Sequence, residues 1–151
     1  DHSEWYRELF APGVAANIIK PSDLAGYRNS QVYISQLKHV PLNANAVRDA
    51  MPAFFDLLKQ ETEPSVRAVL GHFIFVYIHP YMDGNGRMAR FLMNAMLASG
   101  GYPWTVITID NRNRYMKALE KASVESIIDD FAGYLGQIVT KSMDAGTVGA
   151  D

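Results

Sequence analysis

The 151-residue chain lacks cysteine, carries little net charge and has no long hydrophobic run. Without cysteine the fold cannot use disulfides or thiolate metal ligands, and the chain suits a reducing compartment. A formal net charge of −2 provides no general attraction to nucleic acid or to an anionic membrane. No apolar stretch approaches the roughly 20 residues that cross a bilayer. We therefore expect no nucleic-acid partner and no membrane association, and any bound anion must be held by local basic residues.

Length and composition predict one globular domain. With 48% hydrophobic and 20% charged residues, the chain resembles an ordinary soluble protein and is long enough to bury a core. We predict a single domain over residues 1–142, with its core at about 26–139, followed by a flexible tail over 143–151. The chain begins at Asp1 without Met and shows no signal-peptide pattern, which predicts an excised fragment.

Hydrophobic periodicity predicts a mainly α fold, a compact bundle of about six to eight helices with one small β-hairpin. A short helix over 2–10 should turn Trp5 and Leu9 inward, and another is possible around 15–20 before a break at 21–23. Longer helices are predicted over 44–60, 64–78, 86–99, 111–122 and 126–141. In the first of these, Pro52 should cause a kink or a restart.

The 64–78 segment is apolar almost all round, which predicts a central, buried helix. His72 lies on it with no companion ligand, so we expect a core histidine. The stretch Gln31, Val32, Tyr33, Ile34 and Ser35 is β-branched and aromatic, and it predicts a strand that could form a small hairpin with residues 37–40. Two strands are marginal alone, so this hairpin must pack on helices, and Lys38 and His39 should be solvated.

The segment HPYMDGNGRMAR, His79 to Arg90, combines residues suited to phosphate chemistry. His79 is a base near neutral pH, and Asp83 is an oxygen ligand for Mg²⁺. Gly84, Asn85 and Gly86 form a loop whose backbone amides can face an anion at the start of a helix. Arg87 and Arg90 are permanent cations three residues apart, so they share a helix face.

A cation such as Arg87 in the first turn of a helix is unfavourable unless an anion binds there. The sequence therefore predicts a polyphosphate site in which His79 takes a proton from an incoming hydroxyl. The alternative interpretations are a histidine that caps a helix through a carbonyl, and an aspartate that merely forms a turn.

The segment resembles the signature of the Fic family, HPFx(D/E)GNGRxxR, and Tyr81 replaces the usual Phe. Residues 26–28, 32–34 and 39–41 are similar to the family's flap hairpin, and 94, 101–103 and 112–115 also match, so the resemblance covers about 26–139. It implies a Fic-like protein adenylyltransferase that moves AMP from ATP to a Ser, Thr or Tyr hydroxyl of a target protein.

The resemblance also implies the residue roles. His79 would be the general base, and Asp83 would hold Mg²⁺ between the α- and β-phosphates. Gly84, Asn85 and Gly86 would form the anion hole, and Arg87 and Arg90 would bind the β- and γ-phosphates. Tyr115 is a candidate for contacting adenine. The edge of the flap over Val32–Ser35 could add an extended target segment as a strand.

Family members often carry an inhibitory (S/T)xxxE(G/N) helix, but no Ser or Thr here has Glu four residues later. We expect that inhibitor on an upstream segment or a separate antitoxin, or not at all. Removal of AMP, another phosphate transfer at the same site, and a non-catalytic nucleotide-binding interaction module are the alternative functions. We expect a cytoplasmic protein, bacterial or, if its parent is a secreted effector, in a host cytosol.

Overall fold

The computed structural model describes residues 2–16, 26–35 and 37–147, which form a mainly α-helical domain. Six α-helices and one short 3₁₀ helix lie in these ranges: α1 (His2–Ala15), α2 (Ala44–Gln60), α3 (Pro64–Ile78), α4 (Asn85–Ser99), η2 (Ile109–Asn111), α5 (Arg112–Glu125) and α6 (Asp129–Thr147). The predicted helix at 15–20 and the break at 21–23 lie outside the described residues, apart from positions 15 and 16. None of the described helices is both long and apolar enough to traverse a bilayer.

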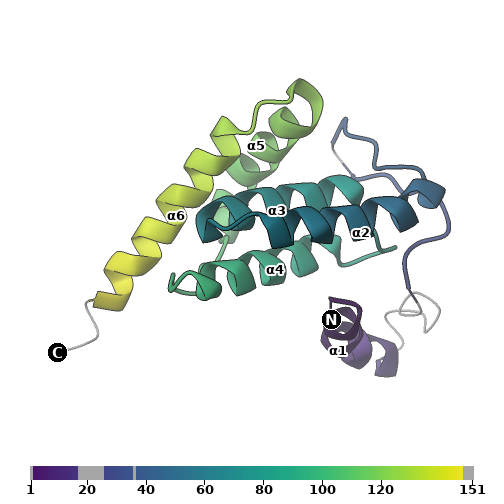
Figure 1. The fold of residues 1–151 in the computed structure, drawn as a ribbon, viewed down its shortest axis with the longest axis horizontal. Helices are drawn as coiled ribbons and strands as arrows, with labels where there is room; N and C mark the ends of the chain where they lie inside the picture. Colours follow the sequence, from purple (N-terminus) through teal and green to yellow (C-terminus); the bar gives the residue numbers. More distant parts are fainter. Residues whose placement is uncertain (1, 17–25, 36, 148–151) are drawn as a thin grey trace.

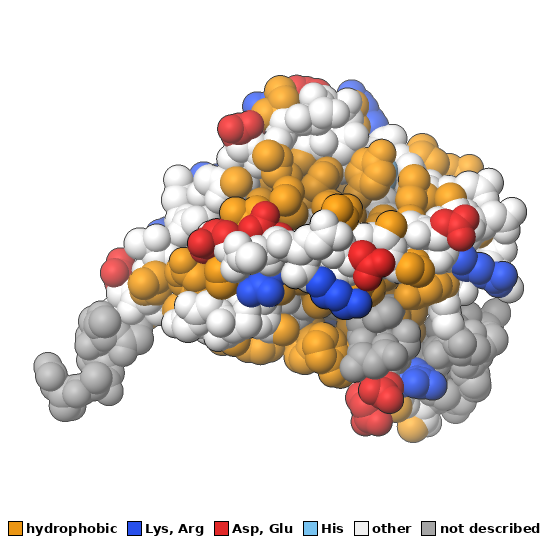
Figure 2. Space-filling model, in the orientation of Figure 1, with side chains coloured by type: hydrophobic (Ala, Val, Ile, Leu, Met, Phe, Trp, Pro, Cys, Tyr) orange, Lys and Arg blue, Asp and Glu red, His pale blue; other side chains and the backbone are white. Residues whose placement is uncertain are grey.

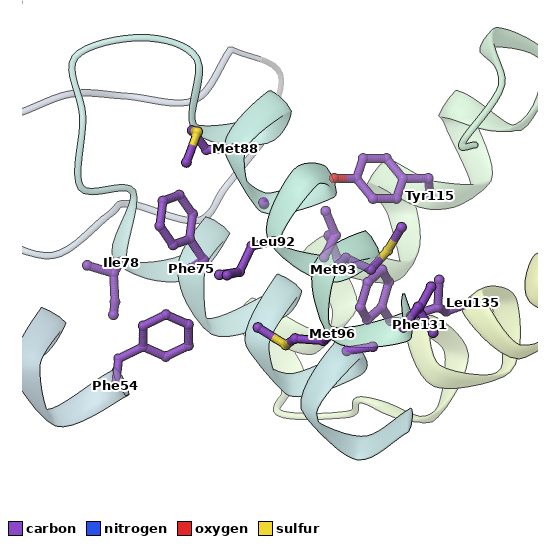
Figure 3. Close-up of a cluster of buried hydrophobic side chains, with 14 of the residues drawn as sticks. Phe54, Phe75, Ile78, Met88, Leu92, Met93, Met96, Tyr115, Phe131 and Leu135 are labelled. Carbon is purple, nitrogen blue, oxygen red and sulfur yellow. The ribbon is translucent and has the colours of Figure 1, made fainter. Parts of the chain in front are cut away.

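Helix α3 is the central element, as predicted. It contacts α2, α4, α5 and α6, and α2, α3 and α4 run side by side in Figure 1. Gly71 allows the close approach of α4, because a Cβ at this position would lie 2.5 Å from the Met96 side chain. Figure 3 shows the resulting core, with Phe75 and Ile78 of α3 among side chains from α2, α4, α5 and α6.

Helix α2 occupies the predicted range and continues through Pro52, which excludes the restart that was one of the two outcomes predicted there. The side chain of Asn43 accepts a hydrogen bond from the Asn45 amide and so caps its first turn. Its buried stripe is Val47, Met51 and Phe54. Figure 2 shows acidic and basic side chains interspersed over the face that carries this helix, so the small net charge is not concentrated there.

The prediction for α1 was wrong about its buried side. Trp5 and Leu9 are 40% and 46% exposed, whereas Tyr6 is 1% exposed. The Tyr6 ring stacks on Tyr81 with ring centroids 3.6 Å apart. Trp5 instead makes an edge contact with Phe91 on the surface of α4.

The predicted β-hairpin is corrected to an irregular loop, because residues 26–35 and 37–43 contain no β-strand. Side chains hold the two arms of the loop together in place of a backbone ladder: the Gln31 amide donates to the Pro41 carbonyl at 3.0 Å. His39 is buried rather than solvated, and its Nε2 lies 3.0 Å from the Tyr77 carbonyl oxygen. At the other end of the chain, α6 continues to Thr147, beyond the predicted start of the tail at 143.

Candidate active site

His79 stands at the carboxyl end of α3 in a left-handed conformation, with φ 54°. This conformation is uncommon for a residue with a side chain and costs about 1–3 kcal/mol, so the surroundings must hold it. Its backbone amide donates to the Phe75 carbonyl at 3.0 Å, and its Nδ1 lies 3.2 Å from the Val76 carbonyl oxygen. A carbonyl only accepts, so Nδ1 carries the ring proton and Nε2 keeps a lone pair.

The electrostatic surroundings keep His79 in that neutral, basic form. Burial is the main cause that lowers the pKa of His79, and the neighbouring Arg28 and His39 lower it further. The hydrogen bond to Val76 and the carboxylate of Asp83 act in the opposite direction. The imidazole is therefore ready to accept a proton at neutral pH.

Arg28 is the residue that holds His79 in place, and it was not predicted as a site residue. It is 2% exposed, and its Nε donates to the His79 carbonyl at 2.7 Å. The guanidinium also donates to the carbonyls of Ser30, Leu42 and Ile78. The Arg28 amide donates to the Pro80 carbonyl at 2.8 Å. A cation at the carboxyl end of α3 also complements the helix dipole.

The loop between His79 and α4 is held in place by two side chains beneath it, those of Asn85 and Tyr6. Asn85 is 1% exposed, its Oδ1 accepts from the Tyr81 amide, and its Nδ2 donates to the Tyr81 carbonyl, both at 2.8 Å. Tyr6 stacks on Tyr81, and its hydroxyl donates to the Asp83 carbonyl at 3.0 Å. The side chain of Asn85 therefore shapes the loop, which leaves its backbone amide as the group that can meet an anion.

Gly84 is the N-cap of α4 and lies in the left-handed region, with φ 79°, which glycine adopts at little cost. The first-turn amides of Asn85 and Gly86 have no intrahelical carbonyl acceptor, so this helix start suits an anion. Arg87 is exposed and forms an ion pair with Asp83 at 3.6 Å. Arg90, one turn further along, is half-buried.

A cavity of about 510 Å³ brings these groups together. His79, Asp83, the loop 84–86, Arg87 and Arg90 line one side of it, and residues 107–109, Arg112, Tyr115, Met116 and Leu119 line the other. Asn94 holds this second wall against α4, because its amide exchanges hydrogen bonds with the Thr105 backbone at 2.7 and 3.0 Å. All the predicted anion-binding residues therefore face one space.

The loop predicted as a flap contributes to this cavity through Ile34 and Leu37. Val32, Tyr33 and Ser35 are not among the residues that line it, and Tyr33 is 77% exposed. Tyr115, the candidate for adenine contact, lines the cavity but directs its hydroxyl to the buried His72, with 2.8 Å between the oxygen and Nε2. His72 is thus a core histidine, as predicted.

A helical domain that gathers an unprotonated imidazole nitrogen, a helix start and two arginines around one cavity has the features of a phosphate-binding protein. Protein adenylyltransferase Fic of Nematostella vectensis is 37% identical over 129 residues, which is 83% of this chain and 30% of that protein. The corresponding protein of Drosophila willistoni is 34% identical over 130 residues, 83% of this chain and 26% of its own length.

Solved structures show the same fold. Fic-1 from C. elegans aligns with TM-score 0.80 and 25% identity over 99% of this chain and 44% of that chain. A Fic domain containing signaling protein from Bacteroides thetaiotaomicron aligns with TM-score 0.71 and 26% identity over 78% of this chain and 52% of that chain. The Fic/DOC family model matches residues 3–97. The chain belongs to the Fic/DOC family, and it spans about a third or less of the length of these two curated relatives.

The metal-ligating side chains present in the protein determine how Mg²⁺ could be held. Within residues 2–16, 26–35 and 37–147, no group of three or more histidines, aspartates or glutamates could hold a metal by itself. The Asp83 carboxylate is 72% exposed and lines the cavity. Mg²⁺ is commonly held by one or two carboxylates together with substrate phosphates. The site therefore fits a Mg²⁺ ion that arrives with a nucleotide and does not fit a metal held by the protein alone.

Proposed function

We propose that this domain is a protein adenylyltransferase, which transfers AMP from ATP to a Ser, Thr or Tyr hydroxyl of a target protein. The observation that carries the proposal is the placement of His79. The Nδ1–H of His79 donates to the Val76 carbonyl, so Nε2 is free to act as a base. The same cavity is lined by the start of α4 and by Arg87 and Arg90. The names and similarity of the Nematostella and Drosophila relatives support the same activity.

The reaction follows from these groups. His79 Nε2 takes the proton of the target hydroxyl as the hydroxyl oxygen forms a bond to the α-phosphorus of ATP. The bond between the α-phosphorus and the oxygen bridging to the β-phosphate breaks, and pyrophosphate leaves. The backbone amides at the start of α4 lie where they can stabilise the negative charge on the phosphate oxygens.

Arg87 and Arg90 neutralise the charge that builds up on the departing pyrophosphate. Without a nucleotide, Arg87 pairs with Asp83 at 3.6 Å in an exposed contact that contributes little stability. ATP offers Arg87 a more highly charged partner, which frees the Asp83 carboxylate. Asp83 would then hold Mg²⁺ together with the phosphates, and the ion supplies further charge neutralisation when bound.

The target protein docks, in this proposal, on the described loop residues 31–35 and 37–38. Ile34 and Leu37 reach the cavity from this loop, while Tyr33 is exposed beside them. Without a paired strand, the loop offers side chains as well as backbone groups to a target. A target segment lying across Tyr33 and Ile34 would bring its hydroxyl to the cavity that contains His79.

Pyrophosphate release and label transfer test the proposal. The domain, Mg²⁺ and α-labelled ATP are incubated with cell lysate, alongside the His79→Ala variant. Label should enter protein together with release of pyrophosphate, and the variant should be slower by about 10²–10⁴-fold because it lacks the general base. Equal labelling by the variant would exclude the assigned role of His79. Label that enters only from γ-labelled ATP would identify a kinase instead.

A further inference from the structure

The docking loop, which comprises residues 31–35 and 37–38, is anchored at its base on α3. The buried His39 follows it directly, and the His39 Nε2 lies 3.0 Å from the Tyr77 carbonyl oxygen. The two rings also pack together, with centroids 4.3 Å apart. Because Tyr77 lies in the last turn of α3, this anchor sets the position of the loop relative to the helix end that carries His79.

The tip of the docking loop is anchored on a different helix, α5. A turn forms the tip, because the Leu37 amide donates to the Ile34 carbonyl at 3.2 Å. The next amide, that of Lys38, donates to the carboxylate of Glu120 in α5 at 2.7 Å. Glu120 is half-buried, and its neighbour Leu119 lines the cavity, as do Ile34 and Leu37. The hydrogen bond from Lys38 therefore joins the loop to α5 at the edge of the cavity.

The hydrogen bond between Lys38 and Glu120 is the strong one at the loop tip. A carboxylate acceptor makes a hydrogen bond shorter and about twice as strong as one between neutral groups. The 2.7 Å distance agrees with this, and the turn inside the tip has the longer distance of 3.2 Å. On the usual scale, a bond of this kind shifts the equilibrium between a held and a released loop by about 10-fold.

We propose that Glu120 is a positioning residue that fixes the tip of the docking loop against α5, so that the loop is preformed for a target segment. The proposal rests on the proposed function, in which the target docks on this loop. Glu120 acts through the Lys38 amide and contacts no reacting atom. A loop that is already held loses less conformational freedom when a target binds than a loop that must first be ordered.

Release of the loop tip would affect target binding and catalysis differently. The contacts that hold His79 come from Arg28 and from the Phe75 and Val76 carbonyls, and none of them involves Glu120. The apparent affinity for the target, in contrast, falls with the fraction of molecules whose loop is in the docking position. Loss of Glu120 should therefore raise KM for the target and leave kcat nearly unchanged.

The experiment removes each partner of the hydrogen bond in turn. Glu120→Ala removes the acceptor, and Glu120→Gln keeps a side-chain oxygen that can accept from the Lys38 amide. Lys38→Pro removes the donor, because proline has no amide hydrogen. The matched control is Glu125→Ala, since Glu125 is also in α5, is exposed and is not among the residues that line the cavity.

The first readout needs neither nucleotide nor target. It is the hydrogen-exchange rate of the Lys38 amide, measured by ¹⁵N NMR after lysine-selective labelling and assigned by the loss of its signal in Lys38→Arg. Exchange should be about 10-fold faster in Glu120→Ala than in the parent, and it should stay within about threefold of the parent in Glu120→Gln and Glu125→Ala. An unchanged rate in Glu120→Ala would overturn the proposal.

The second readout separates KM from kcat for the protein that label transfer identifies as the target. Glu120→Ala and Lys38→Pro should each raise KM by about 10-fold, and the double variant should raise it no further, because both remove the same bond. The kcat, and the dissociation constant of ATP measured by calorimetry in a His79→Ala background, should change by less than about twofold. Glu120→Gln and Glu125→Ala should stay close to the parent.

Three results of the second readout would contradict the proposal. A lower kcat at unchanged KM would mean that Glu120 serves the chemical step, and a 10-fold loss of ATP affinity would mean that it serves the nucleotide. Additive effects in the double variant would show that Glu120 does not act through the Lys38 amide. If the parent transfers no label to any protein, the proposed function fails, while the exchange rate of Lys38 still decides whether Glu120 fixes the loop.

Discussion

Replacing Arg28 with Met should destabilise the domain and remove most of its activity. Met keeps much of the apolar stem and loses all the donors. In the structure, the Arg28 side chain is buried and donates to four main-chain carbonyls, those of Ser30, Leu42, Ile78 and His79. Two of these carbonyls belong to the carboxyl end of α3, where helix geometry provides no other amide donors.

The size of the effect follows from those carbonyls. A buried polar group that loses its partner costs about 1–3 kcal/mol, so two of them together cost about 3 kcal/mol if water reaches them in part. For a domain of this size, that corresponds to a fall of about 10 °C in melting temperature. His79 would also lose the contact that holds its left-handed backbone. A shift of the general base by about 1 Å is enough to slow the reaction by about 10²-fold.

Urea unfolding and an AMP-transfer assay measure the two effects. Arg48→Met is the matched control, since Arg48 lies exposed on α2 and its loss should change stability by less than about 0.5 kcal/mol. Arg28→Lys should fall between the two, because it keeps the charge and lacks the planar fork. If Arg28→Met unfolds at the same urea concentration as the parent and retains its transfer rate, Arg28 does not hold His79 in place.

Four further predictions concern pH and single side chains. Because burial lowers the pKa of His79 from 6.5, the acidic limb of the rate–pH profile should have its midpoint below 6.5, and a midpoint above that value would contradict the account. His72 is neutral in the folded and the unfolded chain above pH 6.5, and below pH 6.5 only the unfolded chain takes up a proton on this residue. The free energy of unfolding should therefore fall by about 1.4 kcal/mol per pH unit between pH 6.5 and about pH 3. Urea unfolding at about pH 7 and pH 5 should show that His72→Gln loses about 2 kcal/mol less than the parent, and equal losses would exclude the effect. Arg87→Ala should weaken ATP binding by about 10-fold in calorimetry and leave stability nearly unchanged, since the side chain is exposed; an unchanged ATP affinity would remove Arg87 from the site. Tyr6→Ala should cost about 3–5 kcal/mol by losing the stack on Tyr81, and Tyr6→Phe only about 1 kcal/mol; thermal melts that rank the two equally would contradict this.

Most of the helical fold could be predicted from the sequence because its helices carry clear periodicity. The predicted ranges 44–60 and 64–78 agree with α2 and α3 at both ends. The first helix continues through Pro12 to Ala15, beyond its predicted end at residue 10. The prediction also placed its largest apolar side chains, Trp5 and Leu9, inside in place of Tyr6. The β-branched stretch at 32–35 has the local composition of a strand, but it forms no strand because its loop is held by side chains such as Gln31.

The site could be predicted where its residues are close in sequence. His79, Asp83 and the arginines lie within one turn and the start of one helix, so spacing alone brings them together. The supporting contacts join residues far apart: Arg28 reaches His79 across 51 positions, and His72 reaches Tyr115 across 43. A buried arginine also runs against the usual placement of that residue on the surface, so hydrophobic periodicity gave no sign of its role. The similarity of residues 26–28 to the family's flap was the only signal that included Arg28.

The proposed transfer of AMP is best tested by mass spectrometry of a target protein that has been incubated with this domain, ATP and Mg²⁺. We expect a hydroxyl side chain that gains one adenosine monophosphate with the parent domain and gains nothing with His79→Ala. A target that gains a single phosphoryl group, or that gains adenosine monophosphate equally with His79→Ala, would contradict it.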